Sequence, residues 1–147
     1  MKFLYSVLIS FFYIGYIKYA PGSLASVLVL IAYYFIPNMI FIQIFLLVLI
    51  FSVGFYLCYY HSQNYFTKDP QYIVIDEVSG MMLCLFMLPK QLDLYILSFI
   101  LFRFFDIYKP LIINKSQNYG FGIGIMADDL ISGFFTMLIV WGLYICF

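Results

Sequence analysis

The residues of this chain that could do chemistry are its carboxylates, which are few and grouped. Only seven of the 147 residues are acidic, and six of these lie singly or in adjacent pairs, at Asp69, Asp76, Glu77, Asp106, Asp128 and Asp129. Ionisable side chains beside apolar spans are costly unless they face a cavity, an ion or one another, so in a membrane protein they indicate a functional site. Arg103 and Lys109 lie on either side of Asp106. The combination predicts a site where a metal ion meets an anionic substrate.

The composition indicates which elements must position these groups. Hydrophobic residues form 66% of the chain and charged residues 10%, whereas soluble domains have about 45–50% and about 25%. The mean hydropathy is +1.05, so we expect an integral membrane protein. One domain covering residues 1–147 fits this length. The formal net charge is zero, which excludes a basic surface for nucleic acid.

Proline, glycine and polar residues divide the apolar sequence into hairpins. The breaks are Pro21, Gly22, Pro37, the polar run 61–70, Pro89 and the glycine-rich stretch 120–124. The apolar segments lack the alternation of barrel strands, and backbone groups in lipid must be satisfied within each segment, so the fold class is all-α. Helices are expected over residues 24–36, 39–60, 78–88, 92–105 and 130–147. Counted as successive legs of a small polytopic bundle, they bring the polar clusters to one membrane face.

The N-terminal run and the lysines bear on topology. Residues 3–17 are apolar and follow Lys2, but no small-residue cleavage pattern comes after them, so we expect a retained first helix, with signal cleavage as the alternative. The lysines on the side of the polar clusters outnumber those opposite, with Lys18, Lys68, Lys109 and Lys115 on that side and Lys90 across from them. This bias favours a cytoplasmic site but does not fix the orientation of the first helix.

Asp76 and Glu77 are expected to open a helix. They follow three apolar residues and precede Gly80, and negative charge is favourable at the positive end of the helix dipole. Neighbouring helical side chains point about 100° apart, so one carboxylate can bind a metal while the other supports it or acts as a base. A simple capping pair is the alternative interpretation.

Arg103, Asp106 and Lys109 recur at three-residue intervals, and Pro110 ends the run. This spacing places Arg103 and Asp106 on one helical face, with Lys109 further round. A cation on each side of a carboxylate can hold a phosphate and a metal together. The alternative is an ion pair between Arg103 and Asp106 that only neutralises both charges.

Small residues near the acidic clusters are candidates for contacting an anion. Gly122 and Gly124 lead into a helix, where free N–H groups suit phosphate oxygens, although glycine also permits close helix packing. Ser23 or Ser26 is expected to cap the helix that begins at residue 24, and the same hydroxyl could touch a phosphate. His61, the only histidine, is expected to be a solvated interfacial residue.

Taken together, four segments resemble the phosphatidylglycerophosphatase A family along nearly the whole chain. They read PGSLAS at 21–26, DP at 69–70 running to IVIDE at 73–77 and GM at 80–81, FR at 102–103 with Asp106 and KP at 109–110, and GIM at 124–126 with DD at 128–129 and Gly133. The family usually has threonine and glycine in place of Ser23 and Ala25, glycine in place of Phe121 and proline in place of Ile112. The change at Phe121 affects the expected phosphate loop and leaves the acidic positions intact.

The resemblance implies a membrane enzyme that uses magnesium to remove the terminal phosphate of phosphatidylglycerophosphate, giving phosphatidylglycerol. We expect the catalytic groups and the ligands of one or two Mg²⁺ ions among five carboxylates, Asp76, Glu77, Asp106, Asp128 and Asp129. Contacts to the substrate are expected from Ser23, Ser26, Arg103, Lys109, Gly122 and Gly124. The sequence does not choose between a general base and a phosphorylated carboxylate.

The expected setting is the bacterial inner membrane, as a multi-pass protein acting on a phospholipid, with no prediction of oligomeric state. The alternative function is a cation transporter whose intramembrane carboxylates form an ion path. A transporter predicts acidic residues spread through the membrane depth. An enzyme acting on lipid headgroups predicts them at one level.

Overall fold

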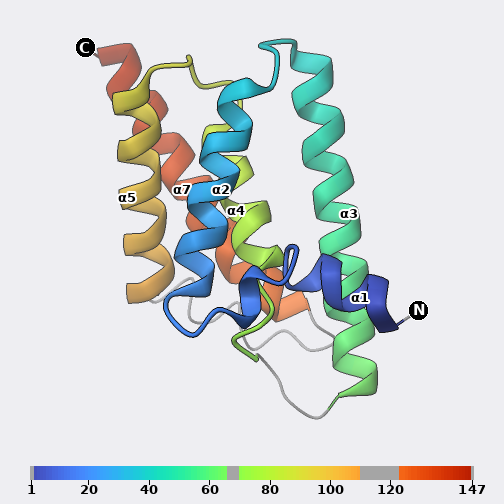
Figure 1. Ribbon diagram of the computed structural model, residues 1–147. Coiled ribbons are helices and arrows are strands. Elements are labelled where there is room, and N and C mark those ends of the chain that lie inside the picture. Colours follow the sequence, from blue (N-terminus) through green and yellow to red (C-terminus); the bar gives the residue numbers. More distant parts are fainter. Residues whose placement is uncertain (1, 66–69, 110–122, 147) are drawn as a thin grey trace.

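The computed structural model describes residues 2–65, 70–109 and 123–146, which form helices joined by turns (Figure 1). Their order is α1 (Lys2–Ile9), the 3-10 helix η1 (Ile14–Tyr16), α2 (Pro21–Phe35), α3 (Ile40–Asn64), α4 (Ile75–Leu85), α5 (Leu92–Tyr108) and α7 (Ile123–Cys146). No strand occurs in these three described ranges. The prediction of an all-α fold is therefore confirmed.

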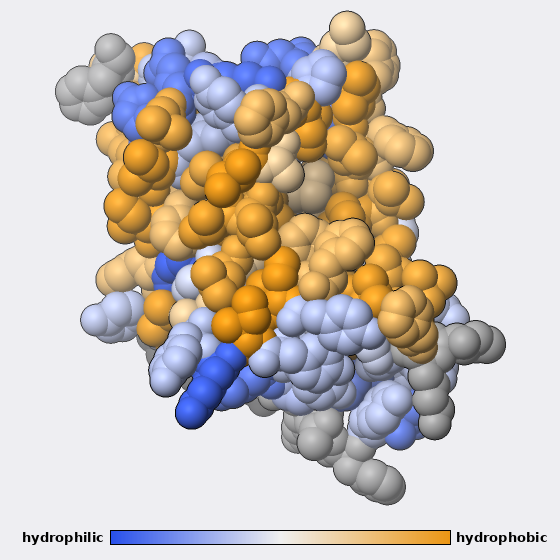
Figure 2. All heavy atoms as spheres, in the orientation of Figure 1, coloured by the Kyte–Doolittle hydropathy of each residue, from blue (hydrophilic) through white to orange (hydrophobic). Residues whose placement is uncertain are grey.

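Two helices are long and apolar enough to cross a membrane. An 18-residue stretch of α3 has a mean hydropathy of 2.6, and one within Gly124–Cys146 of α7 has a mean hydropathy of 1.7. Large apolar side chains point outward from α3, and Phe41 is 83% exposed. Figure 2 shows a band of hydrophobic residues across the middle of the visible face, between hydrophilic residues at both ends. This distribution suits a protein whose middle contacts lipid.

Prolines and a left-handed residue set several helix ends. Pro21 occupies the first turn of α2, where its missing N–H leaves no hydrogen bond unmade. Pro37 follows Ile36, and the residue before a proline avoids helical conformation, so α2 ends at Phe35. Lys109 ends α5 with φ of 40°.

The short helix α4 is the centre of the bundle and contacts α2, α3, α5 and α7. Its approach to α7 depends on two glycines. A Cβ atom on Gly80 would lie 2.7 Å from the carbonyl oxygen of Asp129, and one on Gly133 would lie 2.5 Å from the carbonyl oxygen of Gly80. The two backbones can therefore approach closely only because both positions lack side chains. This contact brings the first turn of α4 beside the first turns of α7.

The N-terminal run does not form the single helix expected over residues 3–17. Helix α1 ends at Ile9, and Phe11, Phe12 and Tyr13 follow with positive φ values of 44°, 57° and 66°. Ser10 stabilises this turn, since its hydroxyl donates to the Ser6 carbonyl and accepts from the Tyr13 N–H at 3.1 Å. Figure 1 shows α1 lying across α3 rather than along it. A run of apolar residues without a proline gives no signal for such a turn.

Candidate active site

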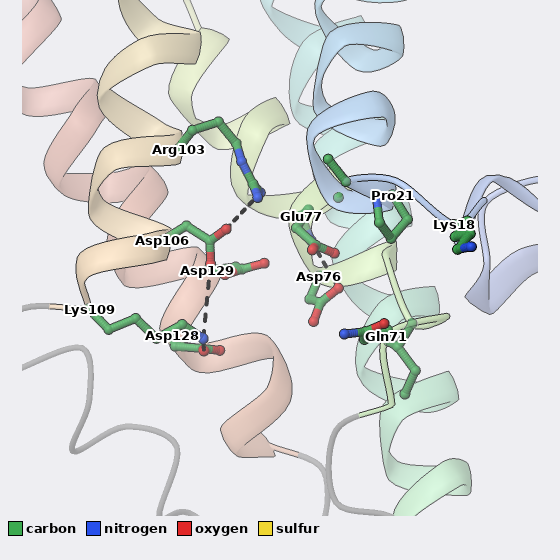
Figure 3. Close-up of a pocket in the computed structure, with 13 residues that line it drawn as sticks. Lys18, Pro21, Gln71, Asp76, Glu77, Arg103, Asp106, Lys109, Asp128 and Asp129 are labelled. Carbon is green, nitrogen blue, oxygen red and sulfur yellow. Dashed lines mark hydrogen bonds and ion pairs between the residues drawn. The ribbon is translucent and has the colours of Figure 1, made fainter. Parts of the chain in front are cut away.

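The predicted polar clusters surround one cavity of about 340 Å³. It lies where the start of α2, the start of α4, the end of α5 and the first turns of α7 meet (Figure 3). Segments far apart in the sequence therefore form one site. Its lining residues are Lys18, Ala20, Pro21, Gly22, Gln71, Ile73, Asp76, Glu77, Arg103, Asp106, Lys109, Asp128 and Asp129.

Three carboxylates form the floor of this cavity. Asp76 and Glu77 lie in the first turn of α4, as the sequence predicted, and Asp129 faces them from α7. Each of the three offers an oxygen within 4.8 Å of the others. Asp76 is 7% exposed and Asp129 is 3% exposed. Such a convergence of buried negative charge is unfavourable unless a cation or protons offset it.

The donor set of this carboxylate cluster fits a hard divalent cation. All three groups offer oxygen, the ligand that Mg²⁺ prefers, and the cavity leaves room for water and substrate oxygens. Oε2 of Glu77 is buried and has no hydrogen-bond partner among the described residues. One oxygen of Asp76 accepts the N–H of Glu77 at 3.0 Å, so Asp76 also helps to start the helix.

Burial acts on the acidity of Asp76, which lies on α4, outside the two helices long enough to span a membrane. It raises the pKa of this carboxyl well above its ordinary value, and the nearby charges of Glu77 and Asp129 raise the pKa further. A bound cation would favour the ionised form and oppose this shift. The raised pKa of Asp76 therefore has the same origin as the cluster itself, which is the burial of several carboxylates close together.

Two cations form one wall of the cavity, and each is paired with an aspartate. Nη1 of Arg103 lies 2.6 Å from Oδ2 of Asp106, and Nζ of Lys109 lies 2.5 Å from Oδ2 of Asp128 and 4.0 Å from Oδ1 of Asp106. The predicted ion pair of Arg103 and Asp106 is present, but it also lines the cavity. Nε of Arg103 is buried without a hydrogen-bond partner in the described part of the chain, which leaves it a donor for an anion.

Lys109 connects α5 to α7. Its left-handed backbone ends α5, and its side chain donates to Asp128 on α7. Burial lowers the pKa of Lys109, but the hydrogen bond and charge of Asp128, with further contributions from Asp129 and Asp106, raise it more, so the net shift is upward. Lys109 therefore remains charged and contributes positive potential at the cavity.

Several predicted substrate contacts do not line the cavity. Ser26 is buried, and its hydroxyl donates to the Gly22 carbonyl at 2.8 Å. Neither Ser23 nor Ser26 caps α2, because Ala20 occupies the N-cap position, so that prediction is wrong. Gly124 is buried at the start of α7 and is absent from the lining.

Some motif residues lie outside the described residues. They are Gly122, Lys68, Asp69, Pro110, Ile112, Lys115, Gly120 and Phe121. The expectations for the phosphate loop at Gly122 and for Asp69 thus stay predictions.

The sequence interpretation missed two kinds of lining residue. Gly22 was expected only to form a turn, yet a Cβ atom there would overlap the Glu77 carboxylate, so glycine makes room for that group. Lys18 and Gln71 also line the cavity. The signal for them was weak, because Lys18 is a single polar residue shortly before the segment 21–26, and Gln71 lies between the two quoted parts of the segment 69–77.

His61 differs from its prediction as well. It is fully buried, and the hydroxyl of Tyr5 lies 2.8 Å from its Nδ1. The ring of Tyr65 stacks on it with centroids 4.9 Å apart. His61 therefore joins α1 to α3 instead of facing solvent.

Five of the chain's seven acidic side chains are gathered at one end of the bundle, whereas Asp93 lies in the first turn of α5. Asp76, Glu77, Asp106, Asp128 and Asp129 all line the same cavity (Figure 3). The transporter alternative predicted acidic groups distributed through the depth of the membrane, and this arrangement does not match it.

An apolar helix bundle with carboxylates and paired cations around a cavity at one end has the features of a membrane enzyme that cleaves phosphate esters. The profile of the family described as Phosphatidylglycerophosphatase A matches residues 7–144. The chain belongs to this family and is a phosphoric monoester hydrolase. No solved structure matches it.

The names of individual relatives agree in part on the substrate. A Phosphatidylglycerophosphatase A from Haemophilus influenzae is 34% identical over 136 residues, covering 88% of this chain and 82% of the relative. One from Escherichia coli is 32% identical over 117 residues, covering 77% and 67%. A protein from Bacteroides thetaiotaomicron named "Putative phosphatidylinositol-3-phosphatase" is 30% identical over 135 residues, covering 86% and 84%.

Proposed function

We propose that this enzyme hydrolyses phosphatidylglycerophosphate to phosphatidylglycerol and phosphate, with Mg²⁺ as cofactor. The observation that carries the proposal is the convergence of Asp76, Glu77 and Asp129 within 4.8 Å, beside Arg103 and Lys109 in one cavity. Family membership and the names of two relatives support this substrate. The name of the Bacteroides relative makes phosphatidylinositol 3-phosphate the second candidate.

Asp76, Glu77 and Asp129 would hold the magnesium ion. When bound, Mg²⁺ would offset negative charge on the phosphoryl group and lower the pKa of a coordinated water. The sequence-based hypothesis gave all five carboxylates to the metal. Because Asp106 and Asp128 are engaged with Arg103 and Lys109, we assign these two aspartates first to holding the cations in place.

Arg103 and Lys109 would bind the phosphoryl oxygens. The buried Nε of Arg103 has a hydrogen to donate, and Asp106 restricts the guanidinium on its other side. Preorganised donors of this kind stabilise the charge that develops during phosphoryl transfer. In the net reaction, water adds its hydroxyl to phosphorus, the bond from phosphorus to the glycerol oxygen breaks, and that oxygen leaves with a proton.

We further propose that the enzyme lies in the bacterial inner membrane with its cavity on the cytoplasmic side. Two apolar helices support membrane insertion. Lys18 and Lys109 line the cavity, whereas Lys90 follows α4 at its other end, and lysines are enriched on the cytoplasmic side of membrane proteins. A lipid headgroup would thus reach the cavity near the membrane surface.

The test is phosphate release by the purified protein in neutral detergent micelles. Phosphatidylglycerophosphate, phosphatidylinositol 3-phosphate and phosphatidic acid are compared, each with Mg²⁺ and with excess EDTA. We expect the highest kcat/KM for phosphatidylglycerophosphate and loss of turnover with EDTA. Full activity in EDTA would contradict the magnesium assignment, and preference for the inositol lipid would replace the substrate.

A further inference from the structure

A cation and an amide on the far wall of the cavity have no part in the hydrolysis described above. Lys18 lies between η1 and α2, and Gln71 lies in the turn before α4. Both line the cavity. In Figure 3, both lie on the opposite side of Asp76 from Arg103, and the amide of Gln71 extends toward Asp76. The cavity therefore has polar groups beyond the place where the phosphomonoester would bind.

Lys18 has a charge available for a ligand. Arg103 and Lys109 are each paired with an aspartate at 2.6 and 2.5 Å. No ion pair joins Lys18 to a carboxylate in the described ranges, and its Nζ lies 5.8 Å from the ring centroid of Tyr19. Its side chain is exposed, so its flexible stem can move to meet an anion at the cavity edge.

The substrate proposed above carries a second anion within the reach of one glycerol unit from the first. Its phosphomonoester is joined through one glycerol to a phosphodiester, which connects the headgroup to the lipid. If the monoester binds beside Arg103 and the three carboxylates, the diester must lie in another part of the cavity. Lys18 and Gln71 supply the charge and the hydrogen-bond donors that a phosphodiester needs.

We propose that Lys18, assisted by Gln71, binds this phosphodiester and selects lipids that carry both a phosphodiester and a phosphomonoester. Phosphatidic acid, which has only the monoester, lacks that contact. Phosphatidylinositol 3-phosphate has both groups, so the same contact serves the substrates named for either kind of relative. The inference rests on the proposed function and identifies which feature of the lipid is recognised.

The test compares the wild type with Lys18→Ala and Gln71→Ala in neutral micelles. The measured quantity is the ratio of kcat/KM for phosphatidylglycerophosphate to that for phosphatidic acid of matched acyl chains. Loss of one charge-assisted contact is expected to lower this ratio about tenfold in Lys18→Ala, mainly through KM. Gln71→Ala should give a smaller decrease. Lys90→Ala removes a lysine that does not line the cavity, so its ratio should equal that of the wild type.

A second measurement does not depend on turnover of phosphatidic acid. Glycerophosphoglycerol, a diester without a monoester, should inhibit the wild type competitively and inhibit Lys18→Ala about tenfold more weakly. Equal losses for both lipids would mean that Lys18 supports folding or attracts the lipid surface, and would overturn the proposal. Unchanged kcat/KM for both lipids in Lys18→Ala would overturn the proposal too. If the wild type hydrolyses neither lipid, the proposed function itself fails and this inference fails with it.

Discussion

At the scale of residues, the five carboxylates of the cavity divide into two groups with different partners. Asp76, Glu77 and Asp129 face one another, whereas Asp106 and Asp128 pair with cations. The first group has excess negative charge and the second is neutralised within the protein. This division predicts that equivalent substitutions in the two groups will affect different kinetic quantities.

The matched pair Asp129→Asn and Asp106→Asn tests this division. Asp129→Asn removes a proposed charged ligand of Mg²⁺, so the Mg²⁺ concentration for half-maximal activity should rise about tenfold and kcat should fall about 100-fold. Asp106→Asn releases Arg103 from its ion pair, so KM for the lipid should rise while the Mg²⁺ requirement changes little. Magnesium titrations of phosphate release measure both. The same shift in Mg²⁺ requirement for both variants would mean that Asp106 is also a ligand.

Gly22 provides a second prediction at this scale. A Cβ atom at this position would overlap Oε1 of Glu77, and the carboxylate is the mobile end of a flexible side chain. Gly22→Ala should therefore displace Glu77 and raise the Mg²⁺ requirement about tenfold, with little loss of thermal stability. Ala20, also on the cavity wall, offers a control, because Ala20→Gly removes a Cβ instead of adding one. An unchanged Mg²⁺ titration for Gly22→Ala would show that the position of Glu77 does not depend on the absence of a side chain at residue 22.

The acidic residues could be predicted from sequence because their chemistry is unusual in so apolar a chain. The spacing of Arg103 and Asp106 also indicated one helical face, and their ion pair on α5 agrees with it. Lys18 and Gln71 could not be predicted, because only the turns before α2 and α4 bring them to the cavity. Their position depends on tertiary contacts that no local pattern encodes.

At the scale of elements, the contact between α4 and α7 holds together the carboxylates that we propose as metal ligands. Asp76 and Glu77 come from α4, Asp129 from α7, and Gly80 packs against the Asp129 backbone. The separation of the two helices therefore sets the separation of the carboxylates. A small increase in helix spacing should weaken the site before it unfolds the protein.

Gly80→Ala is the test of this dependence. Its Cβ would lie 2.7 Å from both the Asp129 carbonyl oxygen and the Phe102 ring, so the helices must separate, which should destabilise the fold by about 1–3 kcal/mol. Gly142→Ala on α7 is the matched control, since no atom lies within 4 Å of its added Cβ. Thermal unfolding in detergent and phosphate release should both decline for Gly80→Ala and stay normal for Gly142→Ala. Equal behaviour of the two variants would remove Gly80 as a determinant of the site.

The helices bounded by breakers were the predictable elements. Expected helices over 24–36, 39–60 and 92–105 correspond to α2, α3 and α5, because proline and polar turns interrupt the apolar sequence there. The last helix begins at Ile123 instead of residue 130, since Asp128 and Asp129 are tolerated within a helix once a cavity receives them. The N-terminal turn was missed, because Ser10 and three left-handed residues replace a conventional breaker.

At the scale of the whole molecule, an apolar middle and a polar end have separate tasks. The hydrophobic band of Figure 2 suits burial in lipid, while the cavity at one end of the bundle collects nearly all the buried charge. A lipid substrate can thus keep its acyl chains in the membrane while its headgroup enters the cavity. The unfavourable convergence of three carboxylates is confined to this end.

This arrangement predicts that Mg²⁺ stabilises the entire fold. Because the three carboxylates converge only in the folded state, the ion should bind the folded chain far better than the unfolded chain, raising the unfolding temperature by about 5 °C at saturation. The measurement is thermal unfolding of the detergent-solubilised protein across a Mg²⁺ titration, with NaCl at equal ionic strength as the control. Asp129→Asn should lose the increase, and Asp106→Asn should retain most of it. An equal increase in NaCl would assign the effect to charge screening, and the carboxylate cluster would then be stable without a specific ion.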